Sequence, residues 1–532
     1  MKHLKLLSLG LLTGLLSVSC HSHTTQISDS GSGSFKSYFE NVPFEMKVLE
    51  RPEFPNRIAN ILDYGAVNNG ITLNTEAINR AIQDIAQKGG GTVVIPEGIW
   101  NTGPITLMDN INLHAEANSL IIFDPNPELY PIIETSFEGL NTRRSTSPIN
   151  AKGATNIAIT GKGVFDGSGD AWRFVKKGKL TSSQWNALVA SGGILNEKKD
   201  TWYPSEQSML GHKISDSFNN PQNLKEDAEW EAIHHWLRPV LLSFVKCKGV
   251  FLEGVTFRNS PAWCLHPLSC EDVILSDLKI FNPWYSQNGD GLDLESCKNA
   301  LIVNCLFDVG DDAMCIKSGK DKDGRDRNEP CENVILKNNV VLHGHGGFVV
   351  GSEMSGGVKN IHVADCLFLG TDVGLRFKST RGRGGVVENI WIENINMVDI
   401  PTEPLLFDLF YSGKSAMEDL EEGREANFDL PPVTEETPSF RNIFIKDVKC
   451  KGARRAMFFN GLPEMKIQNI QVENAIITSR FGAELVHASG VILKNVQILP
   501  EEGPKVKIQY SNDVTIEGEK LPDSEKTAIE IK

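Results

Sequence analysis

Four short clusters of polar residues carry the side chains that acid and base chemistry needs. In chain order they read Asn288-Gly-Asp290-Gly-Leu-Asp293, Gly310-Asp311-Asp312, Gly344-His345-Gly346 and Arg376-Phe-Lys378. Two carboxyl groups that lie close together cannot both ionise easily, so one keeps its proton and acts as an acid while the other acts as a base. If these aspartates meet in the fold, they predict acid and base catalysis, such as cleavage of a glycosidic bond.

The fourth cluster and the residues after it supply positive charge, and no acid lies near them in the sequence. These cations are Arg376, Lys378, Arg381 and Arg383. A carboxylate on a substrate would find its counter-ion there. We therefore expect Arg376 and Lys378 to contact an acidic substrate. Arg381 and Arg383 are either further substrate contacts, the interpretation that we favour, or exposed charges.

Metal binding is the alternative for the aspartates, because Asp pairs often bind hard cations such as Ca²⁺. Residues 321–326 resemble a calcium loop, but the glycine and the third acid are out of the required order, so we interpret them as a solvated loop. No Cys-His spacing indicates zinc. We expect neither a metal nor another cofactor.

The chain around these clusters repeats a unit of short strands. An Asn or Asp followed by alternating apolar residues begins at positions 272, 299, 333, 360, 389, 442 and 469, so the intervals are 27, 34, 27, 29, 53 and 27 residues. The long step holds an acidic insertion at about 411–438. Short strands without long amphipathic helices favour an all-β parallel β-helix, in which successive coils lie ~4.8 Å apart. The asparagines should form a ladder at one corner.

This repeat should bring the clusters together. The anchors Asp290, Asp311, His345 and Arg376 are 21, 34 and 31 residues apart, each close to one coil, so the clusters should stack on one face. Asp311 and Asp312 can share a site only if the backbone bends at Gly310. His266 lies 24 residues before Asp290, one coil below, where a ligand for a sugar hydroxyl and a structural histidine are both open.

Other segments are assigned by their patterning. Apolar periodicity from Asn74 to Ile85, ended by three glycines, predicts a helix that caps the N-terminal end of the core. Residues 173–237 interrupt the repeat and read as an insertion beside the active face, with tryptophans that pack its core or stack on sugars. The interpretation is one β-helix domain over residues 46–532.

Residues 1–20 are typical of an export signal. The apolar run Leu6–Leu16 is too short to span a bilayer. The segment ending at Cys20 resembles a bacterial lipobox, so we expect lipidation of Cys20, with ordinary cleavage as the alternative, and a flexible tether over residues 21–45. We expect a monomer exported by a Gram-negative bacterium, periplasmic or held at the outer membrane only by this lipid.

The net charge bears on possible partners, and the number of cysteines bears on disulfide bonds. The formal net charge of −15 argues against nucleic acid as a partner. Nine cysteines remain after Cys20, an odd number, and several lie in apolar strand-like contexts. We expect them to be buried free thiols.

At the four clusters the sequence resembles glycoside hydrolase family 28, the polygalacturonases. The motifs occur in order as Asn-x-Asp-Gly-x-Asp at 288–293, Gly-Asp-Asp at 310–312, Gly-His-Gly at 344–346 and Arg-x-Lys at 376–378. Residues 63–66, 89–96 and 238–239 also fit, so the resemblance covers most of residues 58–500. It implies a right-handed parallel β-helix of the pectin-lyase-like type whose substrate is a pectic polysaccharide or oligogalacturonide.

The resemblance also implies roles. Asp311 would be the general acid, and Asp290 and Asp312 would position and deprotonate the attacking water in an inverting reaction, although stacked coils place carboxyls nearer together than the ~6.5–9.5 Å usual for inversion. His345 would tune the carboxylates. The positions expected to bind galacturonate are Asn288, Arg376 and Lys378.

Residues 343–357 are more similar to exo-acting bacterial members than to endo-acting ones, and the insertions at 173–237 and 411–438 could close one end of a cleft. Three rival functions stay open. They are hydrolysis of branched pectin (rhamnogalacturonan), a calcium-dependent pectate lyase, and a non-catalytic glycan-binding β-helix.

Overall fold

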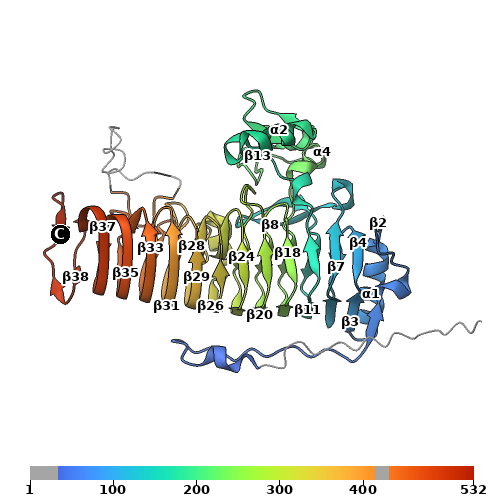
Figure 1. Ribbon diagram of the computed structural model, residues 1–532, viewed down its shortest axis with the longest axis horizontal. Helices are drawn as coiled ribbons and strands as arrows, with labels where there is room; N and C mark the ends of the chain where they lie inside the picture. The colour runs from blue at the N-terminus through green and yellow to red at the C-terminus, as the bar shows by residue number, and fades with distance from the viewer. Residues whose placement is uncertain (1–33, 412, 414–429) are drawn as a thin grey trace, which may run out of the picture. The chain divides into compact units, whose positions relative to one another are not determined.

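The computed structural model describes residues 34–411, 413 and 430–532. Within this part, short strands stack coil upon coil in a sheet of 35 strands, and almost all pairings are parallel (Figure 1). The predicted right-handed parallel β-helix is confirmed. The predicted export signal, Cys20 and most of the acidic insertion lie outside the described residues.

The coils contribute strands to three columns, and from β29 onward one long strand in each coil covers both the second and the third. The column that carries the polar clusters, which we call the site sheet, contains β5 (Ile105–Thr106), β10 (Ile149–Lys152), β16 (Leu242–Val245), β19 (Leu265–Leu268), β22 (Leu292–Glu295), β25 (Asp312–Lys317), β28 (Gly346–Gly351), β30 (Leu375–Lys378), β32 (Leu405–Asp408) and β34 (Arg455–Asn460).

The second sheet contains β1 (Ile58–Asn60), β3 (Gly91–Ile95), β6 (Ile111–Ala115), β11 (Thr155–Gly161), β17 (Lys248–Glu253), β20 (Glu271–Ser276), β23 (Lys298–Val303), β26 (Cys331–Lys337), β29 (Val358–Leu369), β31 (Val386–Ile400), β33 (Ser439–Ala453), β35 (Ile467–Val486) and β37 (Ile492–Gln509). The third contains β2 (Asn69–Leu73), β4 (Gly98–Thr102), β7 (Ser119–Phe123), β12 (Val164–Asp166), β18 (Thr256–Arg258), β21 (Lys279–Phe281), β24 (Leu306–Asp308) and β27 (Val340–Val341). Antiparallel pairs of β37 with β40 (Ile529–Ile531) and of β38 (Thr515–Ile516) with β39 (Glu519–Lys520) lie at the C-terminal end.

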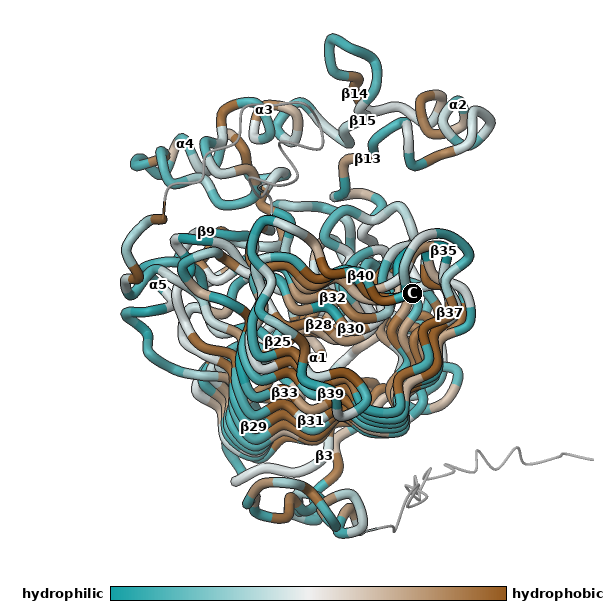
Figure 2. The backbone as a smooth tube through the Cα atoms, turned by 90° about the vertical axis from the view of Figure 1, so that its left-hand side faces the viewer, coloured by the Kyte–Doolittle hydropathy of each residue, from teal (hydrophilic) through white to brown (hydrophobic). Residues whose placement is uncertain are grey.

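Alternating side chains fill the space inside the coils. In β22, for example, Leu292 and Leu294 belong to the continuous core, whereas Asp293 and Glu295 point the other way. Figure 2 looks along the stack and shows hydrophobic residues recurring at the same places in successive coils. The polar clusters can therefore occupy the outer face without interrupting this core.

The predicted asparagine ladder is confirmed. Asn299 donates to Asp272 (3.2 Å), Asn333 to Asn299 (3.2 Å) and Asn360 to Asn333 (3.1 Å). These residues have φ between 57° and 61°, a left-handed conformation that Asn and Asp tolerate better than most residues. A second ladder, which we did not predict, includes Asn394 donating to Asp365 and Asn474 donating to Asp447.

Replacing one ladder residue should destabilise the fold measurably. Asn333→Ala removes two side-chain hydrogen bonds and places at a φ of 58° an alanine, whose side chain cannot hydrogen-bond to the local backbone as that of asparagine can. We expect the free energy of unfolding to fall by about 2–3 kcal/mol in chemical denaturation. Asn333→Gly adopts this φ without strain and should lose less, and equal stability of wild type and Asn333→Ala would contradict this role.

The predicted N-terminal helix is α1 (Thr75–Gln87), which lies at the end of the stack beside β3 (Figure 1). The periodic apolar side chains are all buried, namely Ala77, Ile78, Ala81, Ile82 and Ile85. Because they join the core of the first coils, the helix covers that end of the core as expected.

The predicted tether over residues 21–45 is wrong for residues 34–45. Phe35, in the 3-10 helix η1 (Phe35–Phe39), packs on Phe251 and Ile274 of the second sheet's outer face. The prediction rested on Ser, Thr and Gly content and gave no weight to the aromatic residues of this arm. The domain therefore begins before residue 46.

The predicted insertion at 173–237 lies between β12 and β16. It contains β13 (Val175–Lys176), α2 (Ser182–Ala190), β14 (Ile194–Leu195), β15 (Thr201–Tyr203), α3 (Glu206–Ile214) and α4 (Asp227–Glu231). Four buried tryptophans pack its interior, namely Trp185, Trp202, Trp230 and Trp236. Trp172, just before the insertion, is buried against Tyr130 and His235. A hairpin of β8 (Ile132–Phe137) and β9 (Leu140–Ser145) is a further insertion that we did not predict.

The nine cysteines after Cys20 are buried and unpaired, as expected. Among the described residues, no helix is long and apolar enough to cross a membrane.

Candidate active site

The four polar clusters stack on neighbouring strands of the site sheet, as predicted. Strand pairing aligns Asp293 of β22 with Cys315 of β25, Val349 of β28 and Arg376 of β30. Asp312 lies opposite Gly346 of the next coil. Residues far apart in sequence thus share one face.

Asp311 and Asp312 share the site because the chain bends before the strand. The bend includes Gly310 and Asp311, and β25 begins only at Asp312, so strand alternation does not separate the two side chains. One carboxylate oxygen from each of Asp290, Asp311 and Asp312 lies within 4.8 Å of the other two. A water molecule that bonds to two oxygens at ~2.8 Å each fits such a separation.

Asp312 is held in its anionic form. Lys378 Nζ lies 2.7 Å from one carboxylate oxygen and Arg376 Nη1 lies 3.1 Å from the other. Burial raises the pKa of Asp312, but Lys378, Arg376 and Lys317 outweigh it, so that the pKa falls well below its ordinary range. Asp312 is therefore suited to act as a base.

Asp290 has the opposite environment. It is buried, and Oδ1 has no hydrogen-bond partner. Burial first, and then the carboxylates of Asp293, Asp311 and Asp312, raise the pKa of Asp290 well above its ordinary value. The cluster thus retains a proton in weakly acidic solution.

Asp311 is the accessible member of the trio. Its side chain is 17% exposed, whereas that of Asp312 is 2% exposed. His345 Nδ1 lies 3.2 Å from Asp311, and Nε2 lies 3.7 Å from Asp372. The hydrogen bond to Asp311 raises the pKa of His345, although burial opposes it. His345 is therefore placed to donate a hydrogen bond to the carboxyl that faces solvent.

Of the two cations in the fourth cluster, Arg376 is the more accessible. Its Nε forms no hydrogen bond to any described group. Lys378 was predicted as a substrate contact, but its side chain is only 7% exposed and its amine is engaged by Asp312. Tyr411, which we did not predict, places its ring 4.9 Å from Lys378 Nζ and 5.8 Å from Arg376 Cζ. Tyr411 is the first residue of the acidic insertion, and no sequence pattern there indicated that it would lie at the site.

Three other predicted substrate contacts already have protein partners. Arg381 binds Glu464 at 2.6 and 2.8 Å, and Arg383 pairs with Asp321. The absence of nearby acids in the sequence misled us, because other coils supply them. Asn288 Oδ1 accepts from Arg238 and from Asn219, at 3.0 Å each.

His266 is a structural histidine and not a sugar ligand. It is 1% exposed, and Nε2 lies 2.8 Å from the buried Glu295. Arg327 binds the other oxygen of Glu295 at 2.6 Å. Of the two interpretations left open for His266, burial excludes contact with a substrate.

A buried lysine lies beneath the site. Lys317 Nζ is 2.7 Å from Glu353 and 3.5 Å from Asp293, and it lies 4.8 Å from the ring of Trp263. Sequence reasoning missed it, although strand alternation from Asp293 and Glu295 to the next coil would place a charged residue there. It offsets the negative charge of the acids above it.

The calcium alternative fits these charges poorly. Residues 321–326, which we interpreted as a solvated loop, belong to helix α5 (Asp321–Arg327), whose backbone does not follow a calcium-binding loop. The acid trio is adjoined by Arg376, Lys378 and Lys317, and these cations would repel a divalent cation. Acid and base catalysis is the chemistry that the cluster suits.

Comparison with known proteins agrees with this geometry. The family model described as glycosyl hydrolases family 28 matches residues 230–422, and that described as rhamnogalacturonase A/epimerase, pectate lyase-like, matches residues 58–183. The crystal structure of a hyperthermoactive exopolygalacturonase from Thermotoga maritima has a TM-score of 0.63 and 30% identity, covering 91% of this chain and 96% of that one.

Two relatives show similarity at lower identity. A probable polygalacturonase from Vitis vinifera is 24% identical over 466 residues, covering 84% of this chain and 81% of that protein. An exo-poly-alpha-D-galacturonosidase from Dickeya chrysanthemi is 27% identical over 370 residues, covering 67% of this chain and 58% of that protein.

Proposed function

The chain belongs to glycosyl hydrolases family 28, and from this premise we propose that it hydrolyses α-1,4 linkages between galacturonic acid units of pectin, beginning at chain ends. The observation that carries the proposal is the meeting of Asp290, Asp311 and Asp312 within 4.8 Å, beside Arg376. A non-catalytic glycan-binding protein has no need for such a trio.

Asp311 is the proposed general acid, because it is the carboxyl that a glycosidic oxygen can reach. Asp312, held anionic by Lys378, and Asp290 bind the attacking water, and Asp312 accepts its proton. His345 donates to Asp311 and orients it. The proton thus moves from Asp311 to the leaving oxygen, and water supplies the hydroxyl of the new reducing end.

Arg376 is the proposed contact for a galacturonate carboxylate. Its guanidinium uses Nη1 on Asp312 and on the His345 carbonyl, and Nη2, which bonds to no described group, is left as a donor for a substrate carboxylate. Tyr411 lies beside the same group. Lys378, being buried, acts on the substrate through Asp312.

Product analysis tests the proposal. Polygalacturonate digested over time should give mainly galacturonate or one short product from the start, with no unsaturated product absorbing in the ultraviolet and no loss of activity in chelator. Early mixed oligomers would contradict attack at chain ends, and unsaturated products would indicate a lyase. Cleavage of rhamnogalacturonan alone would overturn the substrate assignment; the family model that matches residues 58–183 is described as rhamnogalacturonase A/epimerase, pectate lyase-like.

The pH dependence follows from the two carboxylate environments. A catalytic base with a lowered pKa loses activity only as the pH falls below that pKa. Among the cations that lower the pKa of Asp312, Lys378 has the largest effect. Lys378→Met should therefore move the acidic limb of kcat/KM to higher pH by about one to two units. An unchanged limb would show that Asp312 is not the base.

We also propose export of the protein with a lipid on Cys20, on the basis of the signal-like residues 1–20. Metabolic labelling with a radioactive fatty acid should mark the wild type and not Cys20→Ala. Equal labelling of both would exclude this site.

A further inference from the structure

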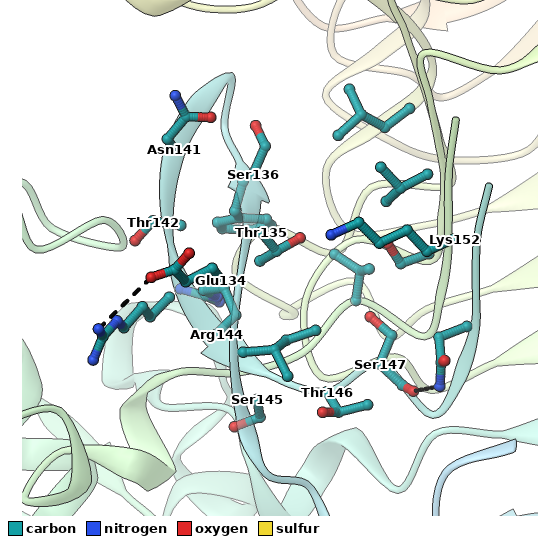
Figure 3. A pocket seen from close by; sticks show the side chains of 18 of the residues that line it. Glu134, Thr135, Ser136, Asn141, Thr142, Arg144, Ser145, Thr146, Ser147 and Lys152 are labelled. Carbon is teal, nitrogen blue, oxygen red and sulfur yellow. Dashed lines mark hydrogen bonds and ion pairs between the residues drawn. The ribbon is translucent and has the colours of Figure 1, made fainter. Parts of the chain in front are cut away.

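A cavity of about 850 Å³ lies between the hairpin β8–β9 and the first strands of the site sheet. Residues of β10, β16 and β19 line one side, and hairpin residues line the other. Figure 3 shows Lys152 extending from its strand toward Thr135 of the hairpin. None of Asp290, Asp311 and Asp312 lines it, so it is distinct from the acid trio.

Packed side chains form part of the wall of this cavity. Phe137 of the hairpin packs on Trp263 with ring centroids 4.5 Å apart, and both are buried. Arg327, which lines the cavity, is held by Glu295 at 2.6 Å and by Ser136 at 3.2 Å. A ligand in the cavity and a substrate at the acids would therefore contact different residues.

Most of the charged residues in the lining are basic, although the protein as a whole has a net charge of −15. They are Arg143, Arg144, Lys152, Lys246 and Arg327, against the single acid Glu134. Arg143 and Arg327 are paired with acids. Lys152 and Lys246 are exposed, and neither side chain forms an ion pair or hydrogen bond with any residue the structure describes.

Arg144 adds a buried positive charge. It donates to the backbone carbonyls of Asn219 and Arg238, and its Nε has no partner. Burial and the nearby Arg238 lower the pKa of Arg144 to about 9. No described carboxylate is hydrogen-bonded to it, so it contributes to the positive potential of the cavity.

Hydroxyl groups occupy much of the remaining lining. They include Thr135 and Thr146 near the hairpin and Ser243 and Ser269 on the strand side. The hydroxyls of Thr142 and Ser145, which also line the cavity, are buried without a hydrogen-bond partner. The hydroxyls of Thr146 and Ser269 donate to Pro131 and Glu329 but can still accept. Cations beside such hydroxyls suit a ligand that carries both carboxylates and hydroxyls.

We propose that this cavity is a second binding site for acidic oligosaccharides, in which Lys152 and Lys246 pair with uronate carboxylates. The hydroxyls of the lining bond to the sugar hydroxyls. The choice of oligogalacturonides as the ligand rests on the proposed function, whereas the preference for a carboxylated over a neutral sugar rests on the cations. The site would hold a pectic chain beside the acids without occupying them.

Calorimetric titration of tetragalacturonate into the Asp311→Asn variant tests this site. Two sites per chain are expected. Adding Lys152→Gln with Lys246→Gln should weaken one of them about tenfold or more and leave the other unchanged. The charge-matched pair Lys162→Gln with Lys279→Gln, two exposed lysines outside the lining, should retain both sites.

Unchanged titrations of the Lys152 and Lys246 variant would overturn the proposal, as would equal binding of neutral maltotetraose in the cavity. Thermal unfolding should be the same for both double variants, because all four lysines are exposed. Failure of the wild type to cleave any galacturonide would refute the proposed function, and the titration would still report separately on the cavity.

Discussion

Asp311→Asn should lower kcat/KM on polygalacturonate roughly a thousandfold, because the amide cannot protonate the leaving oxygen. Substrate affinity should be retained, since Arg376 contacts Asp312 and not Asp311. Reducing-end release and calorimetric affinity measure the two quantities separately.

A nearby aspartate gives a matched control for this change. Asp308 lies on the preceding strand, pairs with His343 at 2.9 Å and is outside the acid trio. Asp308→Asn should keep activity within about twofold, as expected for an exposed ion pair. If Asp311→Asn kept more than a tenth of wild-type activity, Asp311 would not be the general acid.

Lys317→Met should produce the largest loss of stability. The change leaves Glu353 and Asp293 buried without their nearest cation, and breaking a buried pair by removing one partner costs about 3–5 kcal/mol. Chemical denaturation followed by circular dichroism measures it. The loss should be smaller in the double variant Lys317→Met with Glu353→Gln. Glu353→Gln removes one of the two buried carboxylates that Lys317→Met leaves without their nearest cation.

Lys298→Met is the control for this second change. Lys298 pairs with Glu332 at 3.1 Å, but its side chain is 56% exposed. Water screens such a pair, so the expected loss is at most about 1 kcal/mol. Similar losses for Lys298→Met and Lys317→Met would show that Lys317 is not a buried charge partner.

Periodicity in the sequence predicted the architecture well. A repeat near one coil, with an Asn or Asp at a fixed position, predicted both the β-helix and the ladder of Asn299, Asn333 and Asn360, because stacking brings identical positions together. The same register predicted that Asp290, Asp311 and Asp312 meet. The repeat in the sequence was therefore enough to predict which residues meet wherever the coils stack regularly.

Contacts between distant coils could not be predicted in this way. Arg381 and Arg383 looked unpaired because their partners Glu464 and Asp321 are more than 60 residues away. Tyr411 and the hairpin β8–β9 belong to insertions, which do not follow the repeat. We did not predict the packed arm that begins at Phe35, because the prediction followed the Ser, Thr and Gly content of this segment and gave no weight to its aromatic residues.

The central claim is that neighbouring coils bring an acid, a base and one water molecule together at a galacturonide bond. The order in which the anomers of the product appear tests this claim most directly. Proton NMR during the first minutes of hydrolysis should show the β-anomer of the new reducing end before mutarotation, as direct attack by water requires. First appearance of the α-anomer, or of an unsaturated sugar, would contradict the account.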